Sequence, residues 1–267
     1  MMSNLAAPMD WPTVDWQGRE VNCADCACQD LLAREKCQLG HACVNDRYAK
    51  HIDRFFDWNP ERAKDFLSHP YFEVRAVATK HVDVFHLPRM IHDPDETVRW
   101  SAAMRLPPKH LLALIADPHR EVRIRVAARL DLSDLASMRN DPDYYVRQVV
   151  ARRIPESQLP LMMCDKDVAV RRVIAARIGD SWLMSMASDA DPTVRQEVAQ
   201  RLKDTQLQLL ANDPDWRVRY EVARRVPQAY LARMLRDEDP VVREIVGSRL
   251  AAVPRGAGSS GQILSLV

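Results

Sequence analysis

The sequence predicts an all-α solenoid, in which short helical units stack along one direction. The main observation is a fixed period of 24 residues, because repetition at a constant spacing is the signature of stacked repeat units. A Val-Arg pair marks the period, at Val74-Arg75, Val98-Arg99, Val122-Arg123, Val146-Arg147, Val170-Arg171, Val194-Arg195, Val218-Arg219 and Val242-Arg243. The composition agrees: seven glycines and seventeen prolines in 267 residues favour short helices that are interrupted regularly.

Each unit is predicted to contain two short helices. Positions are counted from the Val of each unit, so that the following Arg is at +1. The first helix is expected to begin near an Asp-Pro pair such as Asp117-Pro118 or Asp191-Pro192, because Asp caps free N–H groups and Pro suits the first helical turn. These two pairs differ by two positions, so the cap falls at −5 or at −3. The second half, such as residues 107–114, is too short for more than two turns and is expected to be 3₁₀-helical in part.

Apolar columns predict how the units pack. Val122, Val126 and Leu130 form one stripe along a helix, and Ala127 allows a neighbouring helix to approach closely. The second half of the unit contributes Leu at +13 and Met or Leu at +16. Since 24 residues cannot bury such a stripe alone, the units must stack on one another.

Two arginine columns, at +1 and +7, have two possible explanations. Arg at +1 points partly into the stack and is expected to pair with Asp at −5 or −3 in an internal ladder, because a buried guanidinium needs a partner. Arg at +7 lies in the last helical turn, where free carbonyl groups are available. The alternative is a phosphate-binding stripe for DNA or RNA. The formal net charge of +1 and the matching Asp columns weigh against it.

The chain divides into three predicted parts. Residues 1–58 form a cysteine-rich N-terminal domain with a connecting helix, which the spacing of Ile52, Phe55 and Phe56 indicates. Residues 59–251 form the solenoid of about eight units. Residues 252–267 are expected to be a flexible tail.

Several classes of protein are not supported by the sequence. No stretch approaches the roughly twenty apolar residues of a membrane span, and the N-terminus lacks the features of a signal peptide, so we expect a cytoplasmic protein. Neither HExxH nor a Ser-His-Asp order is present, and all eight histidines lie at or before His119. We therefore do not expect an enzyme.

The cysteines form the one candidate chemical site. Five crowd into 21 residues, at Cys23, Cys26, Cys28, Cys37 and Cys43. Thiolates are soft ligands for Zn²⁺ or for iron–sulfur clusters, both of which take four cysteines.

The spacing within this segment suggests which four cysteines act together. Cys26 follows Cys23 by three positions, which lets the two thiolates converge, whereas Cys28 follows too closely and is left out. His41 could replace a thiolate in a zinc site, and spacing alone leaves zinc and iron–sulfur open. Cys164 stands apart, between the helices of its unit, and is expected to be packed.

A resemblance bears on that choice. The repeated DPxxxVRxxAAxR unit, preceded by Cys23-x2-Cys26, Cys37-x5-Cys43 and the segment 46–56, resembles the leucine-rich repeat variant proteins with an N-terminal iron–sulfur domain. The resemblance covers roughly residues 15–250. It implies a right-handed superhelix of alternating α- and 3₁₀-helices, a [4Fe-4S] cluster bound by those four cysteines, and an origin among nitrogen-fixation genes with no established activity.

Two classes of function follow from these observations. The first is an iron–sulfur repeat protein whose solenoid surface binds a protein partner, with a cluster that serves redox, sensing or structural purposes. The alternatives are a nucleic-acid-binding helical repeat protein that uses its arginine columns, and an interaction module stabilised by zinc.

Overall fold

The computed structural model describes residues 13–252. The chain divides into two compact units, residues 1–150 and 151–267, and each is considered by itself. No strand occurs between residues 13 and 252, and the isolated bridges Val14–Glu20 and Gln38–Ala42 are the extended pairings there. The predicted tail, residues 252–267, lies outside the described residues except for its first residue.

The first unit begins with short elements and then stacks helices in pairs. Its elements are η1 (Cys23–Asp25), α1 (Gln29–Leu32), α2 (Ala49–Trp58), η2 (Pro60–Phe66), α3 (Phe72–His81), η3 (Val84–His86), α4 (Leu87–Met90), α5 (Glu96–Arg105), α6 (Pro108–Leu111), η4 (Leu112–Leu114), α7 (Arg120–Arg129), α8 (Leu132–Leu135), η5 (Ala136–Met138) and α9 (Tyr144–Arg153), which crosses into the second unit. Long helices of ten residues thus alternate with short α- and 3₁₀-helical pieces.

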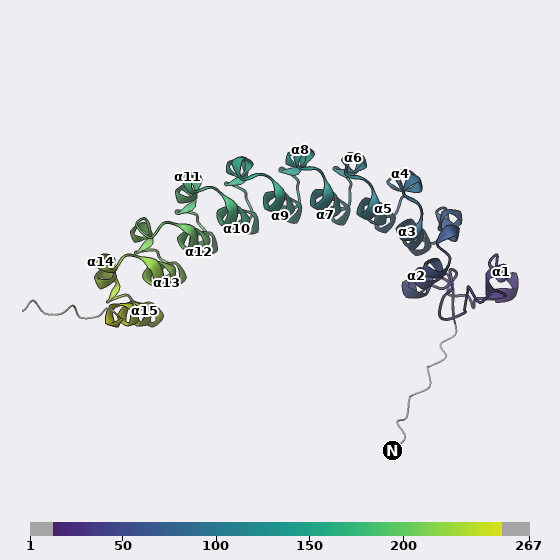
Figure 1. The fold of residues 1–267 in the computed structure, drawn as a ribbon, viewed down its shortest axis with the longest axis horizontal. Coiled ribbons are helices and arrows are strands. Elements are labelled where there is room, and N and C mark those ends of the chain that lie inside the picture. The colour runs from purple at the N-terminus through teal and green to yellow at the C-terminus, as the bar shows by residue number, and fades with distance from the viewer. Residues whose placement is uncertain (1–12, 253–267) are drawn as a thin grey trace, which may run out of the picture. The chain divides into compact units, whose positions relative to one another are not determined.

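The second unit continues the same alternation. Its elements are η6 (Glu156–Met162), α10 (Val168–Arg177), α11 (Asp180–Leu183), η7 (Met184–Met186), α12 (Pro192–Arg201), η8 (Leu207–Leu210), α13 (Trp216–Arg225), α14 (Gln228–Leu231), η9 (Ala232–Met234) and α15 (Pro240–Ala251). Within each unit, Figure 1 shows the long helices side by side in one layer and the short helices in a second layer. The predicted all-α repeat fold, with two short helices per period, is confirmed.

The core lies between these two layers. Val122, Val126 and Leu130 are fully buried, as is Ala127, where α7 meets its neighbours. The +13 leucines and the Met or Leu at +16 close the core from the short-helix side, and they too are buried from Leu87 onward. Each 24-residue repeat therefore buries its apolar stripe against neighbouring repeats, because one repeat is too short to bury the stripe alone.

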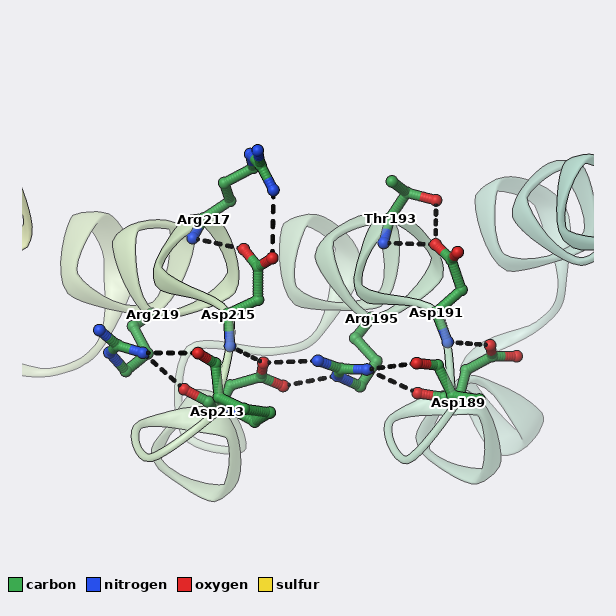
Figure 2. A network of polar contacts seen from close by, with 10 residues as sticks. Asp189, Asp191, Thr193, Arg195, Asp213, Asp215, Arg217 and Arg219 are labelled. Carbon is green, nitrogen blue, oxygen red and sulfur yellow. Dashed lines mark hydrogen bonds and ion pairs between the residues drawn. The ribbon is translucent and has the colours of Figure 1, made fainter. Parts of the chain in front are cut away.

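The helix caps settle the register that the sequence left open. The aspartate at −3 is the N-cap: Asp191 accepts a hydrogen bond from Thr193 N at 2.8 Å, and Asp215 accepts one from Arg217 N at 2.8 Å. The aspartate at −5 instead accepts the N–H of the −3 residue, as Asp213 does from Asp215 N at 2.8 Å. Figure 2 shows both roles in two successive repeats.

Within each compact unit, the +1 arginines connect one repeat to the next. Arg195 donates from Nε and Nη2 to the two carboxylate oxygens of Asp213, at 2.7 and 2.8 Å, in a bidentate pair between side chains 18 residues apart (Figure 2). Its Nη1 donates backwards to the carbonyl oxygens of Asp189 and Ala190. The same bidentate pairing occurs at Arg75–Asp93, Arg99–Asp117, Arg123–Asp141, Arg171–Asp189 and Arg219–Asp237. The internal ladder is therefore present, and the −5 column supplies its carboxylates.

The +7 arginines connect each repeat to the previous one. Arg129 Nη1 donates to the carbonyl oxygen of Ala103 at 2.5 Å, 26 residues earlier, and Arg201 makes the same bond to Ala175 at 2.6 Å. The expected partner type is correct, but the carbonyl groups belong to the end of the preceding long helix rather than to the arginine's own helix. The guanidinium cation is also attracted to the partial negative charge at the C-terminal end of the preceding helix.

Cys164 does not behave as expected. The sequence predicted a packed side chain, whereas the thiol is exposed in the loop between η6 and α10. The loop carries it outward because the neighbouring Met162 fills the +16 core position.

Candidate functional site

The cysteine segment is a compact loop built on short helices and one tight turn. Cys23 begins η1, Cys26 follows the end of that helix, and Cys28 is the residue before α1. Between Cys37 and Cys43 the chain turns back on itself at Gly40, whose φ of +69° favours glycine. The four cysteines expected as ligands are thus brought into one segment together with Cys28.

Cys26 and Cys28 form the first thiol pair. The Cys28 thiol donates a hydrogen bond that lowers the pKa of Cys26 to about 6, and the same bond raises the pKa of Cys28. The Cys26 sulfur also accepts from the backbone N–H of Cys28 at 3.3 Å and from Asn45 Nδ2 at 3.2 Å. This sulfur is therefore surrounded by donors, which is the environment of a thiolate.

Cys37 and Cys43 form the second thiol pair, and Cys23 interacts electrostatically with one member of each pair. The hydrogen bond from Cys37 lowers the pKa of Cys43 and raises that of Cys37. Burial, followed by repulsion from Cys43 and Cys26, raises the pKa of Cys23. Each of the five thiols therefore interacts electrostatically with at least one other thiol of the segment.

The loop is held against the first long helix. Arg54 on α2 donates to the carbonyl oxygen of His41 at 2.8 Å, and Asn59 at the end of α2 donates to that of Lys36 at 2.7 Å. The backbone N–H of Cys43 donates to the carbonyl oxygen of His51, also on α2. A loop with little regular structure is thus fixed by bonds to a helix that packs on the stack.

His41 lies outside the group of sulfurs. Its ring Nδ1 contacts Arg54 Nη1 at 2.9 Å, and desolvation together with the Arg54 cation lowers the pKa of His41. The sequence gave His41 a possible role as a zinc ligand, whereas its ring nitrogen contacts Arg54 and none of the sulfur contacts described above involves it.

The thiols have the chemistry that an iron–sulfur cluster needs, although they do not converge on one metal-ion position. In residues 13–252 no three Cys, His, Asp or Glu side chains are close enough to hold a single metal ion as they stand. The sulfurs pair by hydrogen bonds, Cys28 with Cys26 and Cys37 with Cys43, and Cys28 and Cys43 are both buried. Five adjacent thiols and N–H donors aimed at sulfur match the ligands and hydrogen bonds that iron–sulfur clusters use.

Sequence reasoning missed two residues of this site. Cys28 was set aside for its spacing, yet it hydrogen-bonds to Cys26. Asn45 was not considered, because no spacing rule identifies a side-chain amide that reaches a sulfur 19 residues away. Its position two residues after Cys43 was the one available signal.

The arginine columns offer little to a nucleic acid. Most +1 guanidinium groups are occupied by a carboxylate on one edge and by backbone carbonyl groups on the other, as in Arg99 and Arg123. A phosphate would have to displace a buried aspartate, so these contacts disfavour a phosphate-binding stripe. In residues 13–252 no helix is long and apolar enough to cross a membrane.

Comparisons with known proteins agree with the fold and with the cysteine segment. The profile of a family described as the LRV protein FeS4 cluster matches residues 13–65. A solved structure described as a leucine-rich repeat variant with a novel repetitive structural motif is 41% identical, with a TM-score of 0.83, and the match covers 86% of this chain and 98% of that one.

One curated relative matches a shorter stretch. It is an uncharacterized 27.7 kDa protein in the nifB 3' region of Rhodobacter capsulatus, 50% identical over 97 residues. The match covers 36% of this chain and 40% of the length of that relative.

Proposed function

We propose, from the premise that this chain belongs to the leucine-rich repeat variant family, that it is an iron–sulfur repeat protein with two working parts. The N-terminal domain holds a [4Fe-4S] cluster, and the stacked helical units form a scaffold that binds a protein partner. The observation that supports this most strongly is the gathering of five thiols, with N–H donors directed at the sulfur of Cys26, inside the segment that matches the iron–sulfur family.

The proposed ligands are Cys23, Cys26, Cys37 and Cys43. When bound, the cluster supplies one-electron transfer or a rigid cross-link between its ligands. Asn45 and the Cys28 backbone stabilise negative charge on the Cys26 sulfur by hydrogen bonding. Cys28 acts in this proposal as a neighbour of the ligand, because its thiol donates to Cys26.

The link between the loop and α2 makes the cluster relevant to the stack. Arg54 and Asn59 attach the loop to α2, and α2 packs against α3, the first long helix of the repeats. Order in the cysteine loop therefore supports the end of the stack, and a change in the loop reaches the first repeat. This connection is compatible with a structural role of the cluster and with a sensing role.

The scaffold role rests on the fold. Stacked repeats present extended surfaces, which repeat proteins commonly use for recognition. The relative in the nifB 3' region suggests a connection with nitrogen fixation for this chain also. The repeat fold gives no reason to propose catalysis.

Anaerobic purification, followed by absorption and EPR spectra and by iron, sulfide and zinc analysis, tests the cluster. We expect about four iron and four sulfide per chain. Zinc without iron or sulfide would contradict the cluster and favour the zinc alternative. Reversible reduction without loss of helical signal would favour a redox role, whereas collapse of the N-terminal region on cluster removal would favour a structural one.

Cysteine-to-serine variants test the ligand assignment. Each of the four ligand variants is expected to lose iron, whereas Cys28→Ser and the matched control Cys164→Ser, an exposed thiol far along the chain, retain it. If Cys28→Ser loses iron as completely as Cys26→Ser, the assignment of ligands is wrong.

A further inference from the structure

The last repeat leaves the arginine ladder open. Arg219 chelates Asp237 through Nε and Nη2 at 2.8 and 2.9 Å. The next arginine of the column, Arg243, makes no hydrogen bond or close ion pair with a carboxylate in residues 13–252, and the position 18 residues ahead of it is Gly261.

The guanidinium of Arg243 is nevertheless held as in the inner repeats. Its Nη1 donates to the carbonyl oxygens of Asp237 and Glu238 at 2.6 and 2.9 Å, just as Arg219 Nη1 donates to those of Asp213 and Pro214 at 2.8 and 3.2 Å. Among residues 13–252, no side chain occupies the edge of this guanidinium formed by Nε and Nη2. A group whose orientation is already fixed loses little rotamer entropy when it binds a carboxylate.

The surface around Arg243 also has the character of an inner face. The +8 side chain is fully buried in the preceding repeats, for example in Val226 and Ile178, whereas the equivalent Leu250 on α15 is only half-buried. Arg243 and Leu250 are seven residues apart on α15, so they lie on the same face of that helix.

We propose that this open face of α15, formed by Arg243 and Leu250, docks a partner protein that presents an aspartate at the start of a helix with apolar residues after it. The partner's carboxylate takes the Nε and Nη2 hydrogens of Arg243, as Asp237 takes those of Arg219. Its apolar residues cover Leu250 as the next repeat would. The proposal rests on the scaffold role given above and locates one docking surface on it.

A peptide copied from the chain serves as the first probe. It has the sequence of residues 213–236, which begins with the aspartate that closes the ladder on Arg195. Binding of the labelled peptide to the full chain is measured by fluorescence anisotropy. The substitutions Asp213→Asn in the peptide and Arg243→Gln in the protein are each expected to weaken binding at least tenfold, with no further loss when they are combined. Arg236→Gln, at an exposed arginine of the same end, is the matched control and leaves binding unchanged.

Joining the peptide to the protein allows docking to be detected even if the free peptide binds weakly. The same sequence is joined after residue 267 through a flexible linker, which raises its effective concentration to the millimolar range. Modification of Arg243 by phenylglyoxal is then measured by mass spectrometry. We expect protection of Arg243 with the Asp sequence and none with the Asn sequence.

Three results would overturn the proposal: equal protection by both sequences, no protection by either, or protection of Arg243 in the chain that carries no probe. The iron content of each sample is measured in parallel. Loss of docking with iron retained refutes this surface alone, whereas absence of iron bears on the cluster.

Discussion

Replacing Asp141 by asparagine tests whether the ladder holds the stack together. Asp141 accepts from Arg123 Nε at 2.8 Å and Nη2 at 3.1 Å, and the two residues are 8% and 9% exposed. Breaking a buried ion pair by removing one partner costs about 3–5 kcal/mol, since the other charge is left uncompensated. Asparagine keeps one oxygen for Arg123 and for the N–H of Asp143, so we expect a loss of about 3 kcal/mol. For a chain of this size that corresponds to a melting temperature lower by about 6–12 °C.

The assay is thermal and denaturant unfolding followed by circular dichroism, with Asp215→Asn as the matched control. Asp215 pairs with Arg217, whose side chain is 54% exposed, and asparagine is a good N-cap, so the control is expected to cost less than about 1 kcal/mol. The double variant Arg123→Met with Asp141→Asn should lose less stability than the sum of the two single variants, because no buried charge is left. Equal losses for Asp141→Asn and Asp215→Asn, or additive effects in the double variant, would refute the buried ladder.

The remaining predictions concern acid stability, the backward arginines and the cluster. The hydrogen bond from Arg219 lowers the pKa of Asp237. This carboxylate therefore contributes stability above its unfolded pKa of 3.8, and that contribution is lost as the pH falls through the lower folded value. Denaturant midpoints measured from pH 6 to pH 2 should fall in that window, and they should fall less steeply in Asp237→Asn. Arg129→Met removes a charge-assisted bond to the Ala103 carbonyl and should cost about 1–2 kcal/mol in the same unfolding assay, whereas no loss would show that the bond is dispensable. If the cluster is present, Asn45→Ala removes one N–H donor to the Cys26 sulfur and should make the reduction potential of the cluster more negative. The expected shift is about 40 mV for a hydrogen bond worth about 1 kcal/mol. An unchanged potential in protein film voltammetry would count against a role of Asn45 in tuning the cluster.

The cysteine site illustrates where sequence reasoning reached and where it stopped. The crowding of five cysteines in the first 43 residues marks this segment as the candidate site without any coordinates, since clustered thiols are typical of metal or iron–sulfur sites in reducing surroundings. The contacts of Asn45, Arg54 and Asn59 could not be foreseen. They depend on how an irregular loop folds back onto α2, and such a fold has no periodic pattern to follow.

The sequence by itself determined the period, the all-α repeat fold and the residue types of the ladder, because stacked units repeat their environment and therefore their side chains. Only the tertiary structure decided the pairing. Asp213 and Asp215 are both near enough along the chain to serve Arg195 or Arg219, and the offset between successive long helices assigns Asp213 to Arg195 and leaves Asp215 as a cap. The same offset directs Arg201 to the previous helix rather than to its own. These choices depend on distances between units, and a pattern along the chain does not contain them.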